Sequence, residues 1–299
     1  SVTSSESGVA RLVAGDSQIA SQTLVADAAA TLQVEAQTAV TSAALEVADA
    51  SGNVTVSDTT VGLGTVGNDT LAATGTNLRF LFGFEGDDQF DYSQMSDFVE
   101  DGAVQDVIVG GAGNNQINIA DDGGVTLLAT DSWANVSDVG TLAFTLANAE
   151  NIELAFHANA YEAGLRAVSL AGDTDAQGIN RIDVSSAATS QSLTLIGSSG
   201  PDAVIGGDGD DTLNGGSGND TLTGGLGVDT FEVMAGTDTV TDLGLGGADV
   251  LEVGVGASAT VTVVANWNAL AGTFNDGTVT LTLADGVDVN LALATGSMG

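Results

Sequence analysis

The sequence contains no cysteine and no lysine, and it has one proline and one histidine among its 299 residues. The lack of cysteine excludes disulfide bonds and a thiol nucleophile, and the single histidine has no second histidine with which to form a zinc site. No apolar run reaches the ~18 residues of a membrane span. Only four residues are basic against 40 acidic ones, and the formal net charge of -36 disfavours nucleic acid and anionic membrane surfaces as partners.

Two explanations compete for this acidity, salt adaptation of the whole surface and ligation of divalent ions. Aspartate outnumbers glutamate by 30 to 10, and many of the aspartates follow glycine-rich turns, where a short carboxylate suits a tight loop. This distribution favours ion ligation over salt adaptation alone, although both can hold in one protein.

Residues 197 to 232 divide into four units of nine residues, GSSGPDAVI, GGDGDDTLN, GGSGNDTLT and GGLGVDTFE. A fifth unit, VMAGTDTVT, follows, and after a slip of two residues GLGGADVLE fits again. Glycines at the first, second and fourth places permit sharp turns that bring carbonyl oxygens to one side. The sixth place adds an aspartate, and an all-oxygen, irregular ligand set suits Ca²⁺ better than Mg²⁺. The alternative is a flexible Gly/Asp-rich linker, which would have no reason to place an apolar residue at the eighth place of each unit.

Two units make one turn of a flat coil, so Asp202 should stack on Asp220, Asp211 on Asp229, and Asp220 on Asp238, with room for one ion between each pair. These units resemble the GGxGxDxUx repeats of the RTX (repeats-in-toxin) calcium β-roll. The resemblance implies that each ion takes carbonyl oxygens and an aspartate from two successive turns. The metal ligands predicted in this block are Asp202, Gly206, Gly207, Asp208, Gly209, Asp211, Gly215, Gly216, Ser217, Gly218, Asp220, Gly224, Gly225, Leu226, Gly227, Asp229, Asp238 and Asp249.

A second, degenerate array precedes this block within residues 61–118. GTVGNDTLA places Asp69 at its sixth position, and four units from residue 83 place Asp88, Asp97, Asp106 and Asn115 there. The two middle units have lost most of their turn glycines, which predicts β-roll geometry at the ends of the array and a larger loop near Asp97. One or two ions are expected here, with Asp69, Asp88 and Asp106 as candidate ligands.

The remaining segments predict an all-β protein, a right-handed parallel β-helix or β-roll solenoid with a small C-terminal β cap. Residues 1–60 are interpreted as a β-rich assembly region, although their alanine content leaves a helix open between residues 17 and 49. Residues 119–196 carry strand-like clusters at intervals of roughly ten to twenty residues, as expected for rungs of a β-helix. The calcium β-roll is assigned to 197–252, and a hairpin of strands 279–283 and 287–291 is expected to close the coil within 253–299.

The sequence contains no nucleophile-elbow or P-loop motif, so we expect no enzymatic activity. Parallel β-helices do include polysaccharide lyases that pair calcium with a catalytic Arg or Lys, and Arg166 or Arg181 would be the candidates for that role. The first function hypothesis is therefore an extracellular calcium-binding structural protein that assembles into a surface layer, fibre or biofilm matrix, as a homo-polymer or with other matrix components. A calcium-folded C-terminal module of a larger exported adhesin or enzyme, and a calcium-dependent lyase, are the alternatives.

The RTX resemblance also implies type I secretion in a calcium-poor, extended form, and the spacer segments weakly resemble those of bacterial surface-layer proteins. A glycan partner is compatible with the sequence but has no motif of its own.

Overall fold

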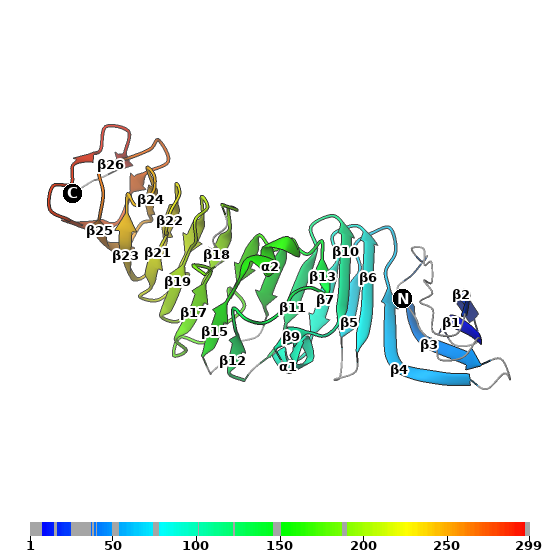
Figure 1. The fold of residues 1–299 in the computed structure, drawn as a ribbon. Coiled ribbons are helices and arrows are strands. Elements are labelled where there is room, and N and C mark those ends of the chain that lie inside the picture. The colour runs from blue at the N-terminus through cyan, green and yellow to red at the C-terminus, as the bar shows by residue number, and fades with distance from the viewer. Residues whose placement is uncertain are drawn as a thin grey trace.

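The computed structural model describes residues 8–14, 17–24, 37, 39, 41–49, 54–73, 78–100, 102–121, 123–145, 151–186 and 190–296. These residues form an elongated stack of short strands that runs from the N-terminal to the C-terminal end of the chain (Figure 1). Successive rungs pair side by side, and most of them contribute one strand to each of two long sheets. The chain is thus an all-β parallel solenoid, as the repeat pattern predicts.

One long face is an eight-stranded parallel sheet. In spatial order it contains β12 (Val125–Leu127), β15 (Ile152–Ala155), β17 (Asn180–Asp183), β19 (Asp202–Ile205), β21 (Thr221–Thr223), β23 (Thr237–Leu243), β25 (Ser258–Val263) and β28 (Thr278–Leu283).

The opposite face is an eleven-stranded parallel sheet. It contains β5 (Thr70–Ala73), β7 (Gln89–Tyr92), β11 (Gln116–Ile119), β14 (Thr141–Phe144), β16 (Ala167–Ser169), β18 (Thr194–Ile196), β20 (Thr212–Asn214), β22 (Thr230–Val233), β24 (Val250–Val253), β27 (Phe274–Asn275) and β30 (Thr295–Gly296).

A seven-stranded mixed sheet occupies the N-terminal part. Its order is β13 (Val136–Ser137), β10 (Val107–Ala112), β6 (Arg79–Glu85), β4 (Val54–Leu63), β3 (Thr41–Asp49), β1 (Gly8–Ala14) and β2 (Ser17–Leu24). Strands β1 to β4 pair antiparallel, and β4, β6, β10 and β13 pair parallel. In the described part of residues 1–60 the strand interpretation is therefore correct, and residues 25–36 lie outside the described part.

Two small sheets and two short helices complete the described residues. β8 (Val99–Glu100) pairs antiparallel with β9 (Ala103–Val104), and β26 (Trp267–Asn268) pairs parallel with β29 (Val289–Asn290). The helices are α1 (Met95–Phe98) and α2 (Ala158–Glu162). Neither helix has the length or the apolar character to cross a membrane, and the described residues contain no other helix that does.

The nine-residue repeat produces turns of 18 residues, as predicted. Val204 pairs with Leu222 across the eight-stranded sheet, and Leu213 pairs with Phe231 across the eleven-stranded sheet. These eighth-place side chains are completely buried between the two sheets. Burial of each such side chain contributes about 1.5–3 kcal/mol, so the core of the roll depends on one apolar residue per unit.

The predicted C-terminal hairpin is wrong. Strand β28 pairs parallel with β25 along its whole length, and β29 pairs parallel with β26. The turn at Ala284–Gly286 therefore connects two sides of one further rung, and it does not reverse the chain within one sheet. The physical reason is that β28 finds an unpaired parallel edge on β25, where six residue pairs form. Residues 278–296 therefore add a further rung to the coil, and their partly buried apolar side chains pack against the end of the core.

Candidate metal centre

The sixth-place aspartates form two ladders, one on each edge of the roll where the turns enter the strands. In each ladder, the Oδ1 atom of one aspartate accepts the backbone N–H of the aspartate one turn earlier. The four bonds of this kind measure 2.9–3.0 Å and join Asp202 to Asp220, Asp220 to Asp238, Asp211 to Asp229, and Asp229 to Asp249. The predicted stacking of aspartates two units apart is thus confirmed.

The second carboxylate oxygen differs between the rungs of the ladders. In Asp202, Asp211 and Asp249, Oδ2 accepts an N–H from its own turn, from Ser198, Gly207 and Gly244 respectively. The Oδ2 atoms of Asp220, Asp229 and Asp238, like that of Asp88 in the earlier array, are buried and accept no hydrogen bond. A buried oxygen without a hydrogen-bond donor lowers the folding stability by about 1–3 kcal/mol, and by more when the group is charged. A bound cation would remove this cost.

The glycines of each turn leave the space that these oxygens occupy. A Cβ on Gly215 or Gly224, at the first place, would stand 2.2 Å from the Oδ2 atom of Asp220 or Asp229. The second-place glycines Gly216 and Gly225 have φ angles of +93° and +101°, and a Cβ there would lie about 2 Å from a carbonyl oxygen one turn earlier. Only glycine therefore lets successive turns approach closely enough to share a cation.

Burial of the ladder raises the pKa values of its carboxylates. Burial, together with repulsion from the neighbouring carboxylates, raises the pKa of Asp229 to about 8 and that of Asp220 to about 7. Burial also raises the pKa of Asp238 and of Asp249 to about 6. Without a cation, Asp220 and Asp229 therefore resist ionisation near neutral pH.

The donor set around each gap consists of two carboxylates and backbone carbonyl oxygens. Within the described residues, no three acidic or histidine side chains converge on one point, so a cation would need carbonyl ligands in addition. The side chains of Asp208 and Leu226 are exposed, so these third-place residues would contribute only their carbonyl oxygens. Such an irregular, all-oxygen set fits Ca²⁺.

The degenerate array contains a shorter ladder of the same design. Asp69 donates its backbone N–H to Asp88 Oδ1, and Asp88 donates its own to Asn115 Oδ1, both at 3.0 Å. Between β7 and β10 the middle units form a larger loop that includes α1, which contains Asp97, as predicted, whereas the end of the second unit continues into β10. With Asn115 neutral, this ladder offers one gap between two carboxylates, the gap between Asp69 and Asp88.

Asp106 lies in a different environment from the other candidate ligands. Its Oδ1 accepts the backbone N–H of Arg79 at 2.8 Å, and its Oδ2 forms an ion pair with Arg79 Nε at 2.8 Å and accepts the Tyr92 hydroxyl at 2.8 Å. The guanidinium also lies 5.5 Å from the centre of the Tyr92 ring. All three side chains are buried. Arg79 supplies a positive charge to Asp106, so we do not include Asp106 in the proposed ion sites.

Two side chains that the sequence did not single out also belong to the ladders. Asn180 pairs with Asp202 and accepts the Ile152 N–H at 2.8 Å, so it extends one ladder into the spacer without charge. Asp242 accepts the N–H groups of Gly224 and Gly225 at 3.0 and 2.9 Å. The two-residue slip in the repeat could have pointed to Asp242. Asn180 lies outside the repeats, so no sequence pattern could have identified it.

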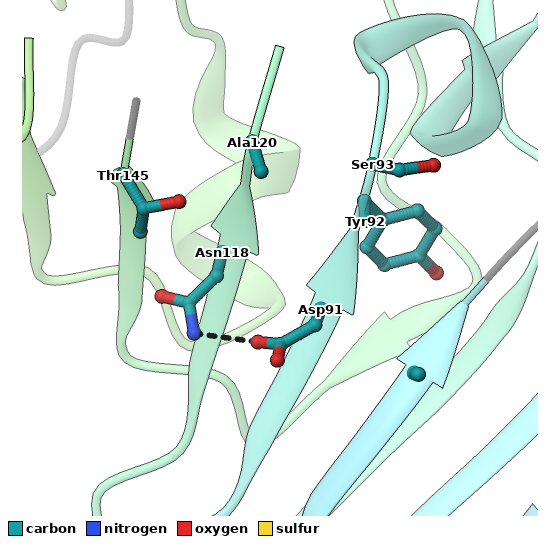
Figure 2. Close-up of a pocket in the computed structure, with 7 residues that line it drawn as sticks. Asp91, Tyr92, Ser93, Asn118, Ala120 and Thr145 are labelled. Carbon is teal, nitrogen blue, oxygen red and sulfur yellow. Dashed lines mark hydrogen bonds between the residues drawn. The ribbon is translucent and has the colours of Figure 1, made fainter. Parts of the chain in front are cut away.

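A hollow of about 420 Å³ lies on the outer side of β5, β7 and β11. Its lining residues are Ala72, Asp91, Tyr92, Ser93, Asn118, Ala120 and Thr145 (Figure 2). Asn118 Nδ2 donates to Asp91 Oδ1 at 2.7 Å, and Asn118 Oδ1 accepts from Gln116. Its main polar groups thus bind one another.

The stacked glycine turns and the two carboxylate ladders define a parallel β-roll whose turns offer oxygen ligands to cations. The chain carries RTX calcium-binding nonapeptide repeats: the family model described as RTX calcium-binding nonapeptide repeat (4 copies) matches residues 92–118, 196–231 and 205–240. No curated protein and no solved structure gives a significant match. The match confirms the resemblance seen in the sequence.

Proposed function

We propose that this chain is an extracellular structural protein whose solenoid folds with Ca²⁺ and then assembles into a surface layer, fibre or biofilm matrix. The observation that carries the proposal is the set of buried Oδ2 atoms in the ladders, which have no donor from the protein. Bound Ca²⁺ would supply positive charge and oxygen coordination between neighbouring turns.

The residues of the roll account for a requirement for calcium. In the ion-free chain, the ladder carboxylates repel one another, and the short glycine-rich strands gain too little from burial to offset their ordering entropy. The sixth-place aspartates of adjacent turns would hold each ion together with the first- to fourth-place carbonyl groups. Because the unfolded chain has no preformed site, the binding energy appears as folding energy.

This coupling suits export. In a cytoplasm with little free calcium the ladder turns would stay open and the chain would remain extended. Extracellular modules typically bind calcium with affinities of about 0.1–1 mM, so the external medium would trigger folding. The RTX repeats themselves support export, since proteins with these repeats are typically exported.

Circular dichroism and sedimentation velocity with and without EGTA test the proposal. We expect the β signal and the thermal midpoint to fall strongly on chelation and to return when calcium is added back. A chain that keeps both unchanged in EGTA would contradict the proposed role of the ladders. Magnesium at the same concentration is the control, because its strict octahedral geometry fits these turns poorly.

The C-terminal end of the solenoid supports assembly by strand addition. Among the described strands, β28 is the last of its sheet, and its inward-facing residues Val279 and Leu281 are only half-buried. Such an edge offers unpaired backbone groups and apolar surface to another chain. In calcium, Leu281→Lys should keep the ladder-dependent fold but lose assembly. The matched control is Thr282→Lys, which changes an exposed residue of the same strand, and this variant should assemble normally. A wild-type chain that stays monomeric at high concentration in calcium would count against assembly.

The proposal of a larger exported protein is tested by the intact mass of the native product, since a much longer chain would make these residues one module. The arginines considered for a lyase have other contacts: Arg166 Nη1 donates to the carbonyl groups of Tyr161 and Leu165, and Arg181 pairs with Asp183. Incubation with acidic glycans would reveal an unsaturated product if the lyase hypothesis held.

A further inference from the structure

The nine-residue phase slips once within the roll, and the slip changes the chemistry of one ion gap. Asp229 and Asp249 are ladder neighbours 20 residues apart, whereas the other aspartate pairs in the roll are 18 apart. The two extra residues lie at the end of β23, where its pairing with β25 shifts register between Val240 and Leu243. As a result, Asp242 stands one turn beyond Gly224, at a level where a regular turn has no carboxylate.

Asp242 replaces two backbone interactions of a regular turn. In the turn that begins at Gly206, the first glycine N–H donates to the Thr223 carbonyl, and the second donates to the turn's own aspartate, Asp211, both at 2.8 Å. In the turn that begins at Gly224, both glycine N–H groups donate to Asp242 instead. Asp242 is 7% exposed, so its charge is held inside the edge of the roll.

This exchange leaves Asp229 Oδ2 without a donor, although Asp229 is only 1% exposed. The same oxygen lies against Gly224, because a Cβ on that glycine would be 2.2 Å away from it. The Gly224 backbone is therefore in contact with Asp229 on one side and with Asp242 on the other. Asp249 completes the group, since its Oδ1 accepts the Asp229 N–H. Asp229 and Asp249 thus border this gap, and Asp242 lies beside it with both of its oxygens accepting glycine N–H groups.

Trp267 packs against the 244–249 turn, which borders the gap. Its indole Nε1 donates to the Asp249 carbonyl at 2.8 Å, and the residue is completely buried. A Cβ on Gly244, in the same turn, would lie 3.4 Å from Trp267 Cβ. The chain's other tryptophan, Trp133, packs against Phe98 and Phe156, in the part of the solenoid that precedes the roll.

We propose that the gap between turns 224–229 and 244–249 is the highest-affinity cation site of the roll, because Asp242 adds a third negative charge beside it. Asp242 acts as a positioning and charge-supplying residue, and the direct ligands are Asp229, Asp249 and carbonyl oxygens. Affinity in oxygen sites rises with the number of ligand charges, so hard divalent and, more strongly, trivalent cations should fill this gap first. The inference rests on the proposed calcium binding.

Terbium luminescence tests it, because a Tb³⁺ ion bound beside Trp267 is excited through the indole. In the wild-type chain, indole-sensitised emission should saturate at a lower Tb³⁺ concentration than the one at which total binding, measured by equilibrium dialysis, saturates. Trp267→Phe should remove most of the sensitised emission. Emission that rises only after most metal is bound would overturn the proposal, and this measurement needs no change to Asp242.

Asp242→Asn should raise the Tb³⁺ midpoint for sensitised emission about tenfold or more, since one nearby charge is removed. Asp210→Asn is the matched control: Asp210 also accepts a backbone N–H one turn away, from Val228 at 2.8 Å, but it is exposed. We expect its midpoint to change less than about twofold. Equal midpoints for the two variants would refute the role of Asp242 while calcium binding stands. No metal binding in any variant would instead refute the proposed function itself.

Discussion

Acid should replace calcium in folding the roll. In EGTA, the folded roll holds carboxylates whose pKa values lie well above the ordinary value of 3.8, namely about 8 for Asp229 and about 7 for Asp220. Between these values and 3.8, the folded state binds protons that the unfolded chain has released. The stability from this source is therefore fully present below about pH 4 and is lost as the pH rises through about 7 to 8.

The size of the effect follows from the two pKa values. Lowering the pH from about 8 to about 5 should stabilise the ion-free roll by about 4 kcal/mol through Asp229 and by about 3 kcal/mol through Asp220. Both side chains are about 1% exposed, so solvent screens them little. The combined change is on the order of the whole stability of a small domain, which is about 5–15 kcal/mol.

Thermal melts by circular dichroism in EGTA, at steps from pH 8 to pH 5, measure this change and stay above the pI of about 4.1. The melting temperature should rise on acidification in EGTA, whereas in millimolar calcium it should not, because protons compete with the ion. Asp229→Asn should remove the larger share of the pH dependence. A melting temperature in EGTA that is constant or falls towards pH 5 would refute the reasoning.

Two further predictions concern sterics and a buried charge. Gly224→Ala should remove at least one bound ion and lower the melting temperature in calcium sharply, because its Cβ would collide with a ladder carboxylate. The control is Gly256→Ala, at a φ of +82° with open space around it, which should cost only about 1 kcal/mol of stability. Isothermal titration measures the number of bound ions, and calorimetry measures the melting temperatures. Arg79→Met should destabilise the N-terminal half by about 3–5 kcal/mol, equally in calcium and in EGTA, since it leaves Asp106 buried without its counter-charge. The control is Arg181→Met, which breaks a partly exposed ion pair and should cost less than about 1 kcal/mol in the same melts. A calcium-dependent effect of Arg79→Met would contradict the assignment of Asp106 to an ion pair with Arg79 and not to an ion site.

Most of the ion site could be predicted because its requirements are local and repeat. A turn that brings carbonyl groups together needs glycine at fixed places, and the carboxylate must follow at a fixed distance, so the repeat alone is enough to place the aspartates from Asp202 to Asp238. The sequence could not show which side chains lie one turn away from each aspartate. Asp106 fits the repeat in sequence, yet its neighbour in the preceding rung is Arg79, 27 residues earlier.

The C-terminal strands show the same limit. A glycine turn between two apolar strands has the same local sequence whether the strands pair with each other or continue a coil, so residues 278–296 resemble a hairpin. Which pairing forms depends on the free edge that the previous rung presents, and here β25 presents one to β28.

The sequence by itself determined the period, the buried eighth-place side chains and the oxygen-rich turns, because each depends on the backbone freedom and polarity of residues close together in the chain. Only the tertiary structure decided which aspartates face an open gap, which one pairs with an arginine and where Asp242 adds a third charge. Those outcomes depend on stacking between turns, where a shift of two residues moves a carboxylate from one level of the ladder to another.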